Sequence, residues 1–286
     1  MPSIDDIAAS MASTRERDAR SLPVELLQPI FEQLLLPSDL LHLLRVSKTF
    51  HRESERALYR YLKFNSPPDF LRFGVLEQLA TRPSAAQSVH TLDFRGLSCN
   101  AWLLPLIKHL SAALRSTLNL KALLLPDQST ADWRDELDTF LPINAPFRLQ
   151  RLDIGHQRDA AIPKMLDFLI TQDRIEDLGA RTKLPSKELP KNSLPFLKTL
   201  RANSDDISDL AIGRPLTRLY CRGPPPFGIR NLRTLYLLQA QYLPIFKASF
   251  PTLRLLVLGR TVCTQPPPPP LPSHPNPDVA PQRFSF

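Results

Sequence analysis

Arginine and tyrosine side chains recur beside a series of leucines in the middle of the chain, at positions that should face solvent. Arginine and tyrosine are among the residue types most used as anchors in protein interfaces, and the planar guanidinium of arginine suits paired hydrogen bonds to a carboxylate or a phosphate. This surface is therefore expected to bind a protein. The candidate substrate-binding residues are Arg151, Arg201, Arg218, Tyr220, Arg222 and Tyr236.

Sequence patterns typical of catalysis are missing. The chain has 8 glycines and contains neither Gly-x-Gly-x-x-Gly nor a P-loop. It also lacks Cys-x-x-Cys, His-Glu-x-x-His and Gly-x-Ser-x-Gly. His156 lies near Asp159, a pairing that could support acid–base catalysis, but a solvated loop histidine is the simpler interpretation. We therefore expect no catalytic residue, no cofactor and no metal site.

Eight hexads share one pattern: an apolar residue, two variable residues, leucine, one variable residue and another apolar residue. They run from Val89 to Leu258, and their central leucines lie 16 to 31 residues apart, at positions 92, 123, 152, 178, 200, 219, 235 and 256. A short strand with inward leucines cannot bury its face alone, so each strand should stack on the next and build a continuous core. The pattern predicts a curved parallel sheet; the alternative is an irregular α/β domain.

Residues on either side of each central leucine should point to the concave, solvent-facing side of this sheet. Asp153, Arg181, Asn203 and Thr234 occupy such positions together with the candidate arginines and tyrosines. Helices expected at residues 102–118, 133–141, 165–170 and 242–250 would lie outside the strands. An ordinary solvated face is the alternative interpretation of the polar residues.

Residues 21–62 form three short amphipathic stretches. Ser21 is the expected N-cap of the first, and Pro29 should kink or split it. Ser38 should cap the second and Ser47 the third. The inward face of the third should be Phe50, Ala57, Leu58 and Tyr61, and its polar face Lys48, Arg52, Glu53, Glu55 and Arg56. A unit of about 40 residues buries too little surface to be stable alone, so its surplus apolar residues indicate a binding face.

This segment resembles an F-box. The matching residues are Leu22-Pro23, Glu25-Leu26-Leu27, Ile30-Phe31, Leu34, Pro37 with Asp39-Leu40-Leu41, and Val46-Ser47-Lys48 with Phe50, where the family usually has tryptophan. The resemblance implies docking on the Skp-type adaptor of a cullin-based ubiquitin ligase. The implied adaptor contacts are Leu22, Pro23, Leu26, Ile30, Leu34, Val46 and Phe50. The alternative is a small helical cap whose leucines are all internal.

The hexads resemble the strands of irregular leucine-rich repeats. The two resemblances together imply an α/β fold: a small N-terminal three-helix F-box followed by a curved leucine-rich-repeat solenoid with a parallel sheet. The expected divisions are a disordered tail over 1–20, the F-box over 21–64, a helical linker over 65–88, the repeat array over 89–262 and a proline-rich disordered tail over 263–286. No polar cap follows the hexad that ends at Leu258, which suggests a shortened array.

The net charge of +8 and the pI near 9.6 favour an acidic or phosphorylated protein partner. The basic residues are scattered along the chain, without a long run of like charge, and aromatic residues make up 8% of the chain without clustering, so nucleic acid is not favoured. Three widely separated cysteines indicate a reducing compartment, cytoplasmic or nuclear. Neither a signal peptide nor a membrane span is expected.

These features lead to one main hypothesis and two others. The chain would be the substrate-recruiting F-box subunit of a Skp/cullin/F-box-type ubiquitin ligase, with no catalysis of its own, and its repeats would bind a substrate protein. The first alternative is a non-catalytic repeat scaffold that binds proteins without delivering them for ubiquitination. The second is a degraded family member that no longer folds fully.

Overall fold

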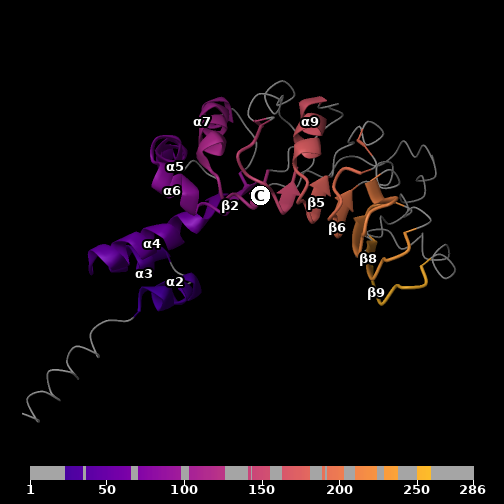
Figure 1. Ribbon diagram of the computed structural model, residues 1–286, viewed down its shortest axis with the longest axis horizontal. Coiled ribbons are helices and arrows are strands. Elements are labelled where there is room, and N and C mark those ends of the chain that lie inside the picture. Colours follow the sequence, from indigo (N-terminus) through magenta and orange to yellow (C-terminus); the bar gives the residue numbers. More distant parts are fainter. Residues whose placement is uncertain are drawn as a thin grey trace, which may run out of the picture.

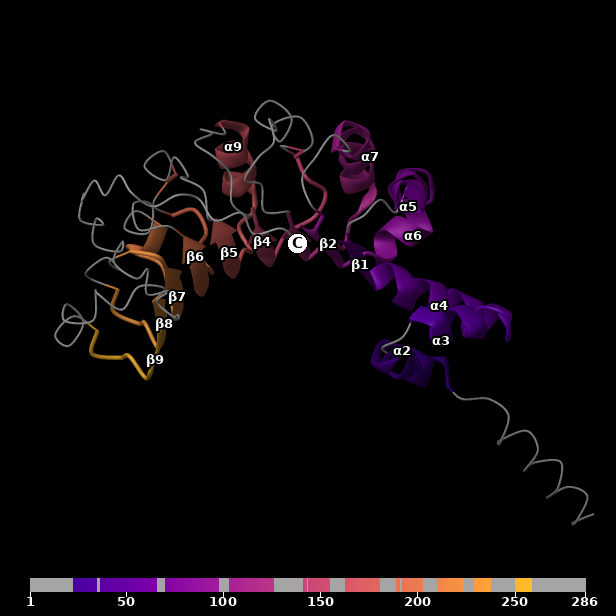
Figure 2. The same cartoon turned by 180° about the vertical axis from the view of Figure 1, so that it is seen from behind.

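The computed structural model describes residues 23–34, 37–65, 70–97, 103–125, 141–142, 144–154, 163–180, 189–190, 192–202, 210–223, 229–237 and 250–258. Within these residues a three-helix N-terminal unit, here called the head, leads into one parallel sheet of nine strands. The sheet curves into an arc, with strands along its inner side and helices along its outer side (Figures 1 and 2).

The head consists of helices α2 (Val24–Gln33), α3 (Pro37–Leu43) and α4 (Lys48–Arg60). The Oγ atom of Ser47 accepts a 3.2 Å hydrogen bond from the Phe50 N–H, which confirms the expected N-cap of α4. Three other expectations were wrong. The N-cap of α2 is Pro23 rather than Ser21, α2 is not split at Pro29, and α3 begins at Pro37 rather than after Ser38. Pro29 lacks an N–H and so removes one backbone hydrogen bond from inside α2, yet the helix continues to Gln33.

Leu27, Phe31 and Leu40 form the small buried core of the head. Phe50 packs edge-on against Phe31, with ring centroids 5.3 Å apart. The expected inward face of α4 is confirmed at Phe50, Ala57 and Leu58, which pack against this cluster. Tyr61 departs from the expectation because the helix ends at Arg60 and Tyr61 begins a strand.

The nine strands pair in chain order, each parallel to the next. The hexad pattern predicted eight of them, β2 to β9, and missed the first. The strands are β1 (Tyr61–Asn65), β2 (Thr91–Gly96), β3 (Ala122–Leu124), β4 (Arg151–Asp153), β5 (Asp177–Ala180), β6 (Thr199–Ala202), β7 (Arg218–Cys221), β8 (Thr234–Leu237) and β9 (Leu255–Leu258).

The central leucines of the hexads form one ladder across the sheet. Each is in register with the next, from Leu92 opposite Leu123 to Leu235 opposite Leu256. The seven from Leu92 to Leu235 are fully buried, because each has a neighbouring strand on both sides. The strand that the pattern missed extends the ladder, since Leu62 of β1 pairs with Leu92. Its sequence, Tyr59-Arg-Tyr-Leu62-Lys-Phe64, fits the same hexad, so the signal was present in the chain.

Helices α5 (Phe70–Thr81), α6 (Pro83–Ser88), α7 (Leu103–Ser116) and α9 (Pro163–Thr171) accompany the sheet. Helices α5, α7 and α9 lie on the outer side of the arc (Figure 1). The expected helices at 102–118 and 165–170 are thus confirmed as α7 and α9. Those expected at 133–141 and 242–250 lie almost wholly outside the described residues. In the part of the chain that the structure describes, no helix is both long and apolar enough to cross a membrane.

Candidate functional site

Helix α2 carries two adjoining apolar stripes. Leu27 and Phe31 lie one helical turn apart and are buried in the head, whereas Leu26 and Ile30 expose 49% and 44% of their surface. Residues four apart share a helix face, so Leu26 and Ile30 present neighbouring apolar side chains to solvent. The head therefore keeps apolar surface that its own core does not use.

Among the residues of the head whose burial is described, four large apolar side chains are exposed, and we call them the exposed head residues: Leu26, Ile30, Leu41 and Val46. Three of them were expected adaptor contacts. Leu41 was not among the expected contacts, although it belongs to the same apolar stretch as buried Leu40. Single exposed leucines are ordinary on protein surfaces, but four within about 40 residues are a concentration that indicates an interface.

The other expected adaptor contacts fall into different environments. Pro23 is exposed, Leu34 and Phe50 are partly buried against the core of the head, and Leu22 lies outside the described residues. Phe50 thus contributes to the internal packing of the head. Its neighbour Phe31 occupies one side of the ring that the family resemblance assigns to the partner.

The polar face expected for α4 needs one correction. Glu53 exposes only 4% of its side chain, whereas Arg52 and Arg56 on the same helix are exposed. Both arginines contact the Glu53 carboxylate, at 3.0 and 3.5 Å. A buried carboxylate is costly without such partners, so this group of three side chains makes burial of Glu53 tolerable.

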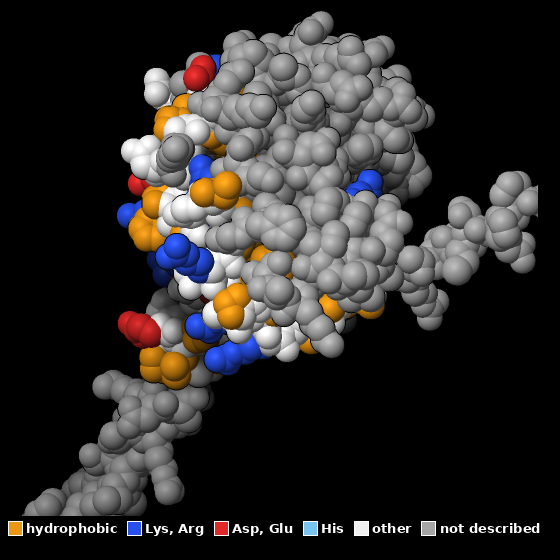
Figure 3. All heavy atoms as spheres, turned by 90° about the vertical axis from the view of Figure 1, so that its right-hand side faces the viewer, with side chains coloured by type: hydrophobic (Ala, Val, Ile, Leu, Met, Phe, Trp, Pro, Cys, Tyr) orange, Lys and Arg blue, Asp and Glu red, His pale blue; other side chains and the backbone are white. Residues whose placement is uncertain are grey.

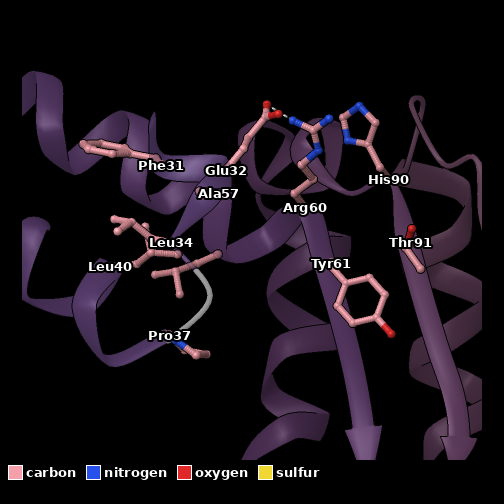
Figure 4. Close-up of a pocket in the computed structure, with 11 residues that line it drawn as sticks. Phe31, Glu32, Leu34, Pro37, Leu40, Ala57, Arg60, Tyr61, His90 and Thr91 are labelled. Atoms are coloured by element: carbon pink, nitrogen blue, oxygen red, sulfur yellow. Dashed lines mark hydrogen bonds and ion pairs between the residues drawn. The ribbon is translucent and has the colours of Figure 1, made fainter. Parts of the chain in front are cut away.

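A cavity of about 450 Å³ lies where the head meets the sheet (Figure 4). Phe31, Leu34 and Leu40 line its head side, and His90 and Thr91 line its sheet side. Glu32 of α2 and Arg60 of α4 form an ion pair at its rim. Because α4 passes directly into β1, the head is attached to the sheet without an intervening loop.

The first two strands are joined on the concave side by a buried carboxylate. Asp93 accepts hydrogen bonds from the Tyr61 hydroxyl at 2.9 Å and from Arg95 Nε and Nη2 at 3.0 and 2.8 Å. Burial would raise the pKa of Asp93, but the hydrogen bonds from Arg95 and Tyr61 outweigh it and hold this pKa below its ordinary value. Burial and the bond to Asp93 also raise the pKa of Tyr61.

Two of the candidate arginines are already paired within the chain. Arg201 lies 2.8 Å from Asp177 and 3.5 Å from Asp153, and Arg151 lies 3.2 Å from Asp177. Asp153 was expected to face solvent, but it exposes only 5% of its surface because Arg201 covers it from two strands away. Gly179 of the intervening strand makes room, since a Cβ there would stand 2.7 Å from the Asp153 carboxylate.

This pairing changes the interpretation of the middle of the concave face. Sequence reasoning counted the arginines and gave Asp177 no role, although register places Asp177 directly beside Arg151. Opposite charges on adjacent strands neutralise each other. Arg151 and Arg201 therefore offer an acidic partner less attraction than their number suggests.

The two candidate tyrosines form one stacked pair. The rings of Tyr220 and Tyr236 lie 4.1 Å apart and within 5° of parallel, and the Arg201 guanidinium lies 5.3 Å from the Tyr220 ring. Burial and the neighbouring Tyr236 hydroxyl raise the pKa of Tyr220. Arg218 is the first residue of β7, and Arg222 follows its last residue. Both are exposed, and neither has a carboxylate partner among the described residues.

The remaining candidates add no chemistry. His156, Asp159, Arg181 and Asn203 lie outside the described residues. Cys221 is buried, as expected for an inward strand position, and burial raises the pKa of its thiol to about 12. Among the residues that the structure describes, no group of three His, Cys, Asp or Glu side chains could hold a metal ion.

Comparison with known proteins identifies one region. The family model F-box-like matches residues 19–65, which contain the three helices of the head and strand β1. No curated protein matches the chain.

Proposed function

From an F-box-like domain over residues 19–65, we propose that this chain is the substrate-recruiting subunit of a Skp/cullin/F-box-type ubiquitin ligase. The observation that carries the proposal is the coincidence of that domain with the exposed head residues. A small helical unit with little core and much exposed apolar surface is suited to a second subunit, because association removes that surface from water.

The nine-stranded sheet would hold the cargo. We propose that it is an irregular leucine-rich-repeat solenoid, a view supported by the ladder of leucines in register and by the sequential pairing of parallel strands. The expected substrate-binding residues lie on or beside its concave face. Of these, the Tyr220–Tyr236 pair and the exposed Arg218 and Arg222 are the most available, since Arg151 and Arg201 are occupied by aspartates.

In this role the chain performs no bond making or breaking. It would hold a substrate close to the ubiquitin-transfer machinery and so raise the effective concentration of the reacting groups. The adaptor and the cullin are partners in this proposal.

The test is binding of the purified full chain to a Skp-type adaptor by biolayer interferometry. The variant Leu26→Asp/Ile30→Asp places two charges in the proposed interface without disturbing buried residues. We expect it to weaken binding by at least about 2 kcal/mol, the loss typical of central interface anchors.

The matched control is Leu118→Asp/Ile170→Asp, which changes two exposed apolar residues outside the head. It should bind the adaptor as the native chain does. Equal binding by the native chain and the Leu26/Ile30 variant would reject the docking assignment. A scaffold without delivery would bind the adaptor, but its captured partners would not accumulate when cullin activity is inhibited.

A further inference from the structure

The net charge of the chain is confined to its C-terminal part. Residues 1–209 contain 27 basic and 27 acidic residues, so they are neutral overall. Residues 210–286 contain 9 basic residues and one acidic residue, Asp278, which accounts for the whole excess of +8. The scattered distribution inferred from the absence of long basic runs was therefore misleading, because the asymmetry arises from the missing acidic residues.

The described part of this basic segment is the end of the sheet formed by β7, β8 and β9. Figure 3 views this end and shows Lys and Arg side chains among hydrophobic ones. Arg214 is buried and donates hydrogen bonds to backbone carbonyls of Ser193 and Leu210. Five arginines are exposed there: Arg218, Arg222, Arg230, Arg233 and Arg254.

Two of these arginines are neighbours across adjacent strands. Arg233 and Arg254 each stand two residues before a central leucine, and the Arg254 N–H donates to the Arg233 carbonyl at 2.9 Å. Both residues immediately precede their strands, so the two side chains start from the same edge of the sheet. Adjacent strands are about 4.8 Å apart, which brings the two side chains close together. Within the described residues, neither guanidinium has a carboxylate partner.

The positions two residues before the central leucines form a row along one edge of the sheet. This row contains a contrasting pair of residues at β5 and β6. Lys198 stands two residues before Leu200, and its Nζ atom lies 2.8 Å from the carboxylate of Glu176, which immediately precedes the neighbouring strand β5. Glu176 occupies the equivalent position before Leu178. The row is thus internally neutralised at β5–β6, whereas its two arginines at β8–β9 have no carboxylate partner in the part of the chain that the structure describes.

A cavity of about 610 Å³ lies beside these two arginines. Its lining includes Arg233, Arg254, Asn231, Thr217, Pro215 and Pro251. Two guanidiniums and an amide can donate several hydrogen bonds to an anion of phosphate size. The prolines give the rim an apolar character that suits a polypeptide.

We propose that this cavity binds a phosphorylated serine or threonine of a substrate polypeptide, with the phosphate between Arg233 and Arg254. The inference rests on the proposed function and deepens it, since it names the substrate class and moves the charged contact from the paired Arg151 and Arg201 to the end of the sheet. A peptide suits the site better than nucleic acid, because none of the described residues that line the cavity is an aromatic residue on which a base could stack.

The experiment measures binding of the full chain to a fluorescent peptide library that has a fixed central phosphothreonine and degenerate flanks. Fluorescence anisotropy reports affinity, and the unphosphorylated library and a single-stranded oligonucleotide are compared in parallel. The variant Arg233→Gln/Arg254→Gln removes both cations while retaining side chains that can form hydrogen bonds. We expect it to lower affinity for the phosphorylated library at least tenfold.

The matched control is Lys121→Gln/Arg115→Gln. Both residues are exposed in the neutral part of the chain, and Lys121 lies in the same row as Arg233 and Arg254. This control should bind the phosphorylated library as the native chain does. Equal loss in both variants, equal binding of the two libraries, or tighter binding of the oligonucleotide that is lost in the Arg233/Arg254 variant would each overturn the proposal.

Adaptor binding is measured on the same samples. The Arg233/Arg254 variant should retain it, whereas the Leu26→Asp/Ile30→Asp variant should lose adaptor and keep phosphopeptide. If the native chain binds phosphopeptide but not the adaptor, the ligase role fails while the phosphate site stands.

Discussion

Leu26 of the head and Leu200 of the sheet are the same residue type in regular secondary structure, yet Leu26 exposes 49% of its surface and Leu200 none. The cause lies in their neighbours. Each inner strand of the sheet has one neighbouring strand on each side, so its central leucine lies between two other leucines in register. Three short helices around a core of Leu27, Phe31 and Leu40 cannot enclose both stripes of α2. The inner strands of the sheet thus complete their own packing, and the head leaves apolar surface for another molecule.

The largest expected effect contrasts those two leucines. Leu200→Ala should lower the free energy of unfolding by about 3 kcal/mol, since it removes buried methyl groups and leaves a cavity in the ladder. Leu26→Ala should change it by less than about 0.5 kcal/mol, because the side chain is already half in water. Chemical denaturation followed by circular dichroism measures both. Similar losses would mean that the head encloses Leu26 after all.

A smaller effect tests how tightly the sheet face is packed, using two glycines. Gly179→Ala should destabilise the fold by about 1 kcal/mol, because the new Cβ would press on the Asp153 carboxylate that Arg201 holds. Gly74→Ala should stabilise it by about 0.5 to 1 kcal/mol, since Gly74 lies inside helix α5 with open space around it. Thermal melting of both variants should show opposite signs. A stabilising Gly179→Ala would show that Asp153 can move away freely.

The smallest effect concerns the joint between head and sheet, by which we mean the contact of Tyr61 in β1 with Asp93 in β2. It is a change in how the free energy of unfolding depends on pH. The pKa of Asp93 is lowered in the folded protein, so its ionised form adds stability that is present above the ordinary value of 3.8 and is lost as the pH falls through the lower folded pKa. Asp93→Asn should remove this contribution and flatten the loss of stability below about pH 4. The check is urea denaturation at several pH values.

The matched control for the joint is Asp173→Asn, an exposed aspartate that lies 3.7 Å from Arg148. This variant should leave the loss of stability at low pH almost unchanged, because exposed ion pairs contribute little to the free energy of unfolding. If Asp93→Asn loses stability at low pH as the native chain does, other carboxylates are responsible for that loss.

Much of the architecture could be read from the sequence because its signals are local. The hexad around Leu200 specifies a strand through its own alternation, and the same pattern repeats often enough to imply stacking. Ser47 identifies the start of α4 for a similar reason, since a capping side chain acts within three residues. Strand β1 was missed because Tyr61 was assigned to the inward face of the third helix of the head.

The candidate surfaces were less predictable because they depend on pairs of strands. Whether Arg201 is available depends on Asp153 and Asp177, which lie 48 and 24 residues away in the chain and meet it through register. Whether Arg233 is available depends on the absence of such a neighbour within the described residues. A count of charges treats these arginines as equivalent, whereas their neighbours in the folded chain decide which of them can bind an acidic partner.

The sequence by itself determined the apolar period of the head, the ladder of leucines and the excess of positive charge, since these depend on residue type and order along the chain. The tertiary structure alone decided which leucines of α2 face water, which arginines are neutralised and which carboxylates are buried. The physical reason is that burial and ion pairing act over a few ångströms between atoms, and only the folded chain brings distant residues that close.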